Sequence, residues 1–105
     1  MSRPIELHVT CPDEATARAL AAAAVEARMA ACATVSGPVT SVFHWQGKVE
    51  AEAEWQLACK THTGVLDDLV ALLRARHPYD LPVITWMETG MEPDAAAWLR
   101  DETGA

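Results

Sequence analysis

The chain has 105 residues, which is room for one domain, so residues 1–105 are expected to fold as a single unit. Half of the residues are hydrophobic, yet no apolar run approaches the roughly 20 residues of a membrane-spanning helix, and the first residues lack a signal-peptide pattern. A net charge of −7 without a lysine or arginine cluster argues against electrostatic binding of nucleic acid. We therefore expect a cytoplasmic protein without a membrane or nucleic-acid partner.

The first third of the chain predicts a strand, a helix and a second strand. Apolar and polar residues alternate over 5–10, the two-residue period of a strand. A helix should follow over 12–29, with Pro12 as its first residue and acidic residues at its positive end. Its expected buried stripe consists of Ala17, Leu20, Ala24 and Ala27. The apolar run 30–35 predicts a strand that ends at the Ser-Gly-Pro sequence 36–38.

Residues 39–61 predict a long β-hairpin that reverses at Gly47, where a tight turn needs a positive φ. One parity of its second arm is apolar and should be buried, namely Val49, Ala51, Ala53, Trp55, Leu57 and Cys59. The other parity begins with Glu50, Glu52 and Glu54 and should face solvent or cationic partners. Arms of about ten residues exceed the usual strand of about 5–6 residues, so the hairpin should overhang a small domain. Because its tryptophans then need cover from another subunit, we expect an oligomer.

The last third predicts a helix over 63–76, a strand over 83–88 and a terminal helix over 93–100. Thr63 is the expected capping residue of the first helix. Its apolar stripe consists of Leu66, Leu69, Val70 and Leu73. The order β-α-β-β-α-β plus a tail helix predicts an α+β fold, a ferredoxin-like sandwich with both main helices on one face of an antiparallel sheet.

Six short motifs follow one another along the chain, at 10–14 (TCPDE), 26–32 (EARMAAC), 41–50 (SVFHWQGKVE), 60–61 (KT), 77–82 (HPYDLP) and 98–99 (WL). In this order and spacing they resemble the CutA family of divalent-cation-tolerance proteins over nearly the whole chain. The resemblance implies a ferredoxin-like subunit of a tight homotrimer, in which each long hairpin extends the sheet of a neighbouring subunit.

Three positions depart from the family pattern. The chain has Phe43 and Ala95 where the family usually has tyrosine, and Val83 where it usually has glutamate. Each change removes a polar group. A metal site close to His77 would therefore have one oxygen donor fewer than in a typical relative.

His77 and Cys11 are the candidate metal ligands. The His77 imidazole follows a helix in a proline-stiffened loop, where it could bind copper or zinc, or cap the negative helix end as a cation. Cys11 lies before a helix N-terminus that favours thiolate, although a small buried hydrophobe is the competing interpretation. The expected ion is copper(II) or another divalent cation, without an organic cofactor. Cys32 and Cys59 are expected to be packing residues.

Three residues match family positions and could bind a small anionic ligand or form ion pairs between subunits: Lys48, Glu50 and Lys60. Tyr79 is a fourth candidate for ligand binding, because it offers a hydroxyl in the same loop as His77. The remaining histidines are expected to be solvated or at sheet edges: His8, His44 and His62.

Enzyme motifs such as G-x-S-x-G or a P-loop do not occur in the sequence, so we expect no enzymatic activity. The predicted function is divalent-cation (copper) tolerance, with a metal or small ligand bound in clefts between the subunits of a homotrimer. The alternative is a PII-like trimeric sensor or scaffold, whose clefts bind an anionic metabolite or a protein partner through Lys48, Lys60 and Arg76. A weaker third possibility is a small hydrolase that uses a thiol.

Overall fold

The computed structural model describes residues 2–104. Along the chain its elements are β1 (Pro4–Cys11), α1 (Glu14–Glu26), β2 (Cys32–Trp45), β3 (Lys48–His62), the 3-10 turn η1 (Thr63–Val65), α2 (Leu66–Arg76), β4 (Thr85–Glu88) and α3 (Pro93–Glu102). Among these residues, no helix is both long enough and apolar enough to cross a membrane.

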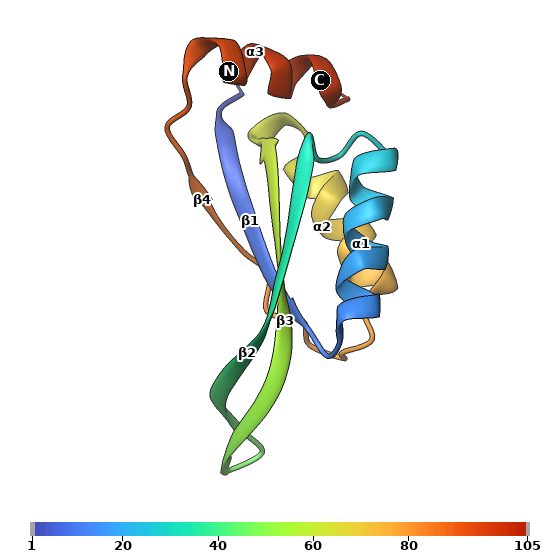
Figure 1. Cartoon of the computed structure of the whole chain (residues 1–105), viewed down its shortest axis with the longest axis vertical. Coiled ribbons are helices and arrows are strands. Elements are labelled where there is room, and N and C mark those ends of the chain that lie inside the picture. The colour runs from blue at the N-terminus through green and yellow to red at the C-terminus, as the bar shows by residue number, and fades with distance from the viewer. Residues whose placement is uncertain (1, 105) are drawn as a thin grey trace.

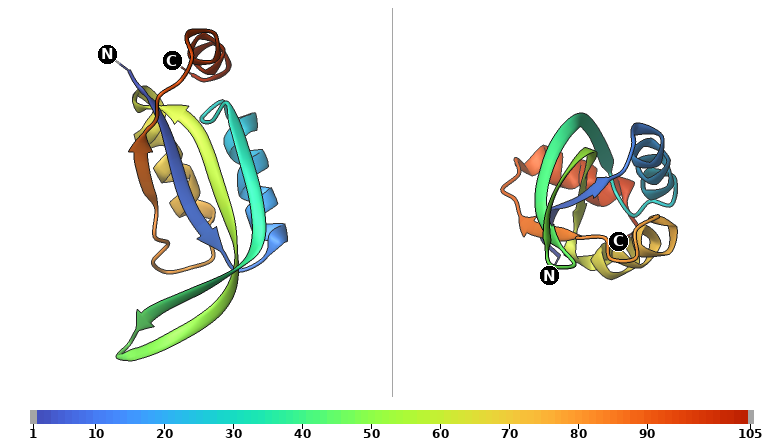
Figure 2. Two further views of the ribbon diagram at one scale, coloured as in Figure 1. Left: turned by 60° about the vertical axis from the view of Figure 1, so that its left-hand side comes forward. Right: turned by 90° about the horizontal axis from the view of Figure 1, so that it is seen from below.

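The described strands form one four-stranded sheet in the order β2-β3-β1-β4, and every neighbouring pair is antiparallel. Helices α1 and α2 cover one face of this sheet, as Figures 1 and 2 show. Helix α3 crosses the end of the sheet where the N-terminus lies, and the β2–β3 hairpin projects from the opposite end (Figure 1). The mixed α+β fold predicted from the sequence is thereby confirmed.

The core lies between the sheet and the two helices that cover it. It is built from the inward parity of β1 and β3, from one stripe of each helix and from Ala30 between α1 and β2. The members are Leu7, Val9, Cys11, Ala17, Leu20, Ala24, Ala30, Leu57, Cys59, Leu69 and Leu73. The residues of the two predicted stripes are buried or packed against the core except Ala27, the C-cap of α1, which is exposed. The helix also begins later than expected, since the Asp13 side chain caps it by accepting a hydrogen bond from the Thr16 N–H over 2.7 Å.

The expected break between two strands at 36–38 is wrong, because β2 runs through this segment as one strand of 14 residues. Its pairing with β3 shifts register between Ser36 and Val39, which is how a bulge absorbs an irregular stretch without ending the ladder. Gly37 has a φ of +156° and precedes a cis peptide bond to Pro38. The Trp55 ring packs against the Gly37 backbone, so this glycine provides space for a large side chain.

The hairpin is longer than predicted and largely uncovered within one subunit. Residues Gln46 and Gly47 have positive φ angles of 51° and 81°, which suit the tight turn at its tip. Val42 and Val49 are 68% and 65% exposed. Among the residues of β3 that were predicted to be buried, Trp55, Leu57 and Cys59 are buried or half-buried. The three residues nearer the tip, Val49, Ala51 and Ala53, are exposed. Near the tip the ribbon extends beyond β1 and the helices, so no other element of the subunit packs against it.

Replacing Gly37 with alanine should lower the free energy of unfolding by about 1–3 kcal/mol, the usual cost of overpacking. The new Cβ would lie 2.7 Å from Cδ2 of Trp55, so the ring or the strand would have to move. Chemical denaturation at a fixed protein concentration measures the loss. The matched control is Gly90→Ala, whose Cβ would meet no described heavy atom within 4 Å. Equal losses in the two variants would contradict this account of Gly37.

Candidate functional site

The loop that follows α2 attaches to the end of β1 through His77. The buried His77 ring accepts a hydrogen bond from the Tyr79 N–H at Nδ1 over 3.1 Å, and its Nε2 lies 2.9 Å from the Thr10 carbonyl oxygen. Since Nδ1 accepts, the network assigns the ring proton to Nε2, which donates to Thr10. Both nitrogens of a neutral imidazole are therefore engaged by backbone groups of the same subunit.

Tyr79 connects this loop to the hairpin. Its hydroxyl donates a hydrogen bond of 2.7 Å to Oε2 of Glu54, a carboxylate only 5% exposed. Burial and the bond to Glu54 raise the pKa of the Tyr79 hydroxyl, so the phenol stays protonated. The Tyr79 and His77 rings lie 4.8 Å apart at 52°. His77, Tyr79 and Glu54 thus form one hydrogen-bonded cluster, the hairpin-root cluster. It joins the loop after α2 to the end of β1 and to the root of the hairpin.

Glu54 is a member of this cluster that the sequence did not reveal. It was expected to face solvent or cationic partners with Glu50 and Glu52, because the three share one parity of β3. That expectation is wrong for Glu54, since Tyr79 covers it from a loop 25 residues away in sequence. The alternation of side chains along a strand predicts which face of the sheet each one lies on. It does not predict which loop from elsewhere in the chain will cover that face.

Cys11 lies at the same end of the sheet, as the last residue of β1 and the register partner of Trp55. Burial, followed by the negative charges of Glu54 and Asp13, raises the pKa of its thiol to about 11. The N-terminus of α1, which begins just after Cys11, does not offset this rise in the thiol pKa. Cys11 is therefore a protonated thiol in this subunit, in agreement with its interpretation as a small buried hydrophobe.

The two predicted metal ligands lie at the same end of β1, since Cys11 is its last residue and the His77 ring lies 2.9 Å from the Thr10 carbonyl oxygen. The negative charge of Glu54 also acts on the Cys11 thiol. Thiolate, imidazole and carboxylate groups suit a divalent transition metal such as copper(II). In residues 2–104, however, no group of three or more histidine, cysteine and acidic side chains is placed to hold a metal ion. A cation could use these donors only after Cys11 lost its proton and His77 gave up a hydrogen bond. The donor chemistry fits, but one subunit does not hold a preformed site.

The four predicted ligand-binding residues do not meet within one subunit. Lys48 and Glu50 lie at the tip of the hairpin, whereas Lys60 lies toward the other end of β3, where it pairs in register with Glu6. Tyr79 alone of the four belongs to the cluster at the hairpin root. Their joint action on one ligand would require residues from several subunits.

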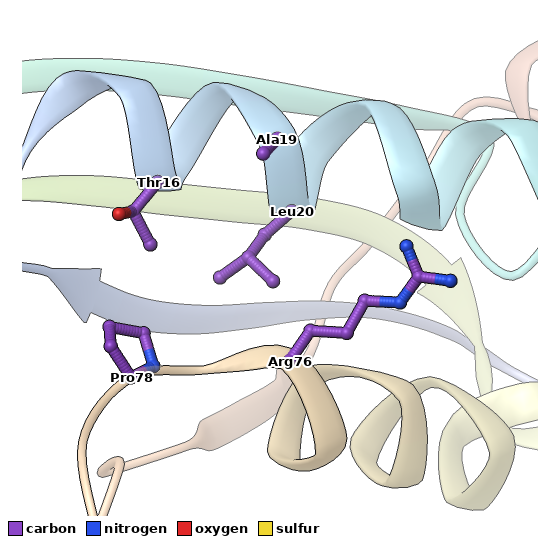
Figure 3. Close-up of a pocket in the computed structure, with 5 residues that line it drawn as sticks. All are labelled: Thr16, Ala19, Leu20, Arg76 and Pro78. Atoms are coloured by element: carbon purple, nitrogen blue, oxygen red, sulfur yellow. The ribbon is translucent and has the colours of Figure 1, made fainter.

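A shallow groove of about 230 Å³ lies between α1 and the end of α2, lined by Thr16, Ala19, Leu20, Arg76 and Pro78 (Figure 3). In Figure 3 the Thr16 hydroxyl and the Arg76 guanidinium lie at opposite ends of the groove and point apart. A second groove, of about 210 Å³, is lined by His8, Val9, Thr10, Gln56, Val83 and Thr85. Neither groove is lined by the side chains of the hairpin-root cluster.

The chain is a small α+β domain, in which a protruding hairpin meets a loop that carries a histidine and a tyrosine. A family model described as CutA1 divalent ion tolerance protein matches residues 5–102. The chain belongs to the CutA family, as its motifs predicted.

Curated and solved relatives agree with this assignment. The divalent-cation tolerance protein CutA of Salmonella newport is 40% identical over 91 residues, which are 86% of this chain and 79% of the relative. The structure of Cut A1 from Thermus thermophilus has a TM-score of 0.93 at 35% identity, covering 96% of this chain and 99% of that one. CutA from Synechococcus elongatus has a TM-score of 0.89 at 36% identity, covering 94% and 88%.

Tyr79→Phe should lower the free energy of unfolding by about 1.5–3 kcal/mol, because the buried Glu54 carboxylate loses its hydrogen-bond donor. The loss should be smaller in a Glu54→Gln background, where the group left without its donor is uncharged. Denaturation of the two single variants and the double variant, at one protein concentration, measures the coupling. Identical losses from Tyr79→Phe in both backgrounds would show that the two groups are not coupled.

Cys11 should resist alkylation in the folded protein. With a thiol pKa of about 11 and no exposed surface, it should react with iodoacetamide at pH 8 at least roughly a hundredfold more slowly than a free peptide thiol. Peptide mass spectrometry of the native protein gives the rate, and denatured protein serves as the control. A native rate close to the denatured one would contradict the burial described here.

Proposed function

We propose that the chain is a ferredoxin-like subunit of a homotrimer, which binds a divalent cation or small ligand in the clefts between subunits. The observation that carries this proposal is the uncovered hairpin, whose apolar side chains include Val42, Phe43, Trp45 and Val49. The edge strand β4 also carries exposed apolar side chains, at Trp86 and Met87. Exposed apolar surface on a long ribbon and on a sheet edge favours cover by another chain.

The hairpin-root cluster is the best-supported place for the ligand. Cys11 ends β1 at the level of Trp55, and beyond that point β3 continues without β1 beside it. A neighbouring subunit that covers the hairpin would therefore come close to Cys11, Glu54 and His77. It could then supply the groups that a single subunit lacks.

Copper(II) is the proposed ion, because imidazole and thiolate ligands bind it more strongly than other divalent first-row metals. Relatives of this chain are named as divalent-cation tolerance proteins, which supports a role in metal tolerance. The alternative of a PII-like sensor depends on Lys48, Lys60 and Arg76. These lie at the hairpin tip, toward the far end of β3 and at the end of α2, so cation binding has the stronger support.

Native mass spectrometry with and without stoichiometric copper(II) tests both parts of the proposal. We expect a trimer that takes up about one copper ion per chain. Because the bound ion replaces the Cys11 proton, uptake should rise with pH. A monomer would contradict the covered hairpin, and a trimer without copper would contradict cation binding.

Variants then locate the ion. Cys11→Ser and His77→Ala should both abolish copper uptake, whereas Cys32→Ser and His44→Gln should retain it. The two control variants remove a thiol and an imidazole that lie outside the cluster. Loss of copper in His44→Gln, with full uptake in Cys11→Ser, would place the ion on the exposed hairpin instead.

A further inference from the structure

His62 was expected to be solvated or at a sheet edge, but it is 1% exposed. It is the last residue of β3 and lies at the end of the sheet that α3 crosses in Figure 1. Its Nδ1 accepts a hydrogen bond from the Gly64 N–H over 3.1 Å. The ring lies so close to Gly64 that a Cβ there would be 2.8 Å from Cε1 of the histidine. Thr63, the expected cap of this segment, instead accepts a bond from the Arg3 N–H.

The hydrogen bonds of His62 suit only its neutral form. Since Nδ1 accepts from Gly64, the ring proton is on Nε2, which has no hydrogen-bond partner among the described residues. Protonation would put a second N–H where the Gly64 N–H now donates. That bond would be lost, and the imidazolium would be buried without an acceptor for either N–H group.

The charges around His62 also oppose protonation. Burial lowers the pKa of His62, and the positive charge of Arg100 on α3 lowers it further. On β3 itself the nearest charge of the same parity is Lys60, which pairs in register with Glu6 of β1. The register partner of His62 is the uncharged Pro4, and the Arg3 side chain is paired with Glu88 over 3.1 Å. We find no carboxylate bonded to His62 in the described part of the chain.

We propose that His62 is an acid-sensitive latch, whose protonation releases α3 from the end of the sheet. Leu99 is the fully buried residue of α3, and the far end of the helix is held by an Arg28–Glu102 ion pair of 3.5 Å and a Gly104 N–H bond to the Arg28 carbonyl. So few contacts suit an element that opens before the rest of the subunit. The closed state binds the neutral ring, so it is stable above the ordinary histidine pKa and loses stability as the pH falls below about 6.5.

Hydrogen exchange measured by mass spectrometry tests the latch on the full chain between pH 7.5 and pH 5, where exposed carboxylates remain ionised. After correction for intrinsic exchange rates, opening of the α3 peptide should increase as the pH falls. The increase should be at most roughly tenfold per pH unit, the limit for uptake of one proton. Protection of the core strands β1 and β3 should change much less over the same range.

His62→Gln should remove this pH dependence, because glutamine can accept the Gly64 bond and cannot be charged. His44→Gln is the matched control, since it removes an exposed histidine and should leave the dependence intact. Arg100→Gln provides a second test that does not alter the buried ring. Removing this positive charge should raise the pKa of His62 and shift the opening to higher pH. An unchanged pH dependence in His62→Gln and Arg100→Gln would overturn the proposal. A loss of protection spread evenly over the whole chain would also overturn it.

Discussion

The β2–β3 ribbon is much longer than the other strands of the sheet, and this difference determines how much of the ribbon a single chain can bury. Strands β2 and β3 have 14 and 15 residues, whereas β1 has eight and β4 has four, so the ribbon leaves the sheet that anchors it. A single subunit can bury only the half of the ribbon that lies over α1 and α2. The uncovered half keeps the alternating apolar pattern of a buried strand. The same alternating pattern therefore supplies core residues at one end of the ribbon and exposed apolar side chains at the other.

The point where the ribbon leaves the sheet is also where the polar groups gather. Three hydrogen bonds link His77, Tyr79 and Glu54 to one another and to the end of β1. These bonds hold the loop after α2 in place, and they also occupy groups that would otherwise be free to bind a ligand. A ligand at these atoms would therefore have to break one of these hydrogen bonds. Among the described residues, no group of three or more histidine, cysteine and acidic side chains is placed to hold a metal ion.

Local sequence patterns predicted the elements of the fold, but contacts between distant segments decided the site. Helix α2 followed from its stripe at Leu66, Leu69, Val70 and Leu73, because periodicity is a property of neighbouring residues. The break expected at Gly37 was wrong, since ladder pairing with β3 carries the strand through a bulge. Glu54 could not be identified as buried, because its cover comes from Tyr79 in the loop after α2. His62 could not be identified either, because its ring turns back onto Gly64 in the 3-10 turn that follows β3. The sequence analysis selected Cys11, His77 and Tyr79 as candidate binding residues. The structure places them near the point where the hairpin leaves the sheet, and their binding role stays a prediction.

We have proposed that a neighbouring subunit covers the hairpin and completes a cation site at its root. A crystal structure of the copper-loaded protein, with anomalous data collected at the copper edge, would show both features at once. We expect a trimer in which a partner chain lies over Val42 and Val49. We also expect an anomalous peak within bonding distance of the Cys11 sulfur. A hairpin exposed to solvent, or copper bound only to surface histidines, would contradict the proposal.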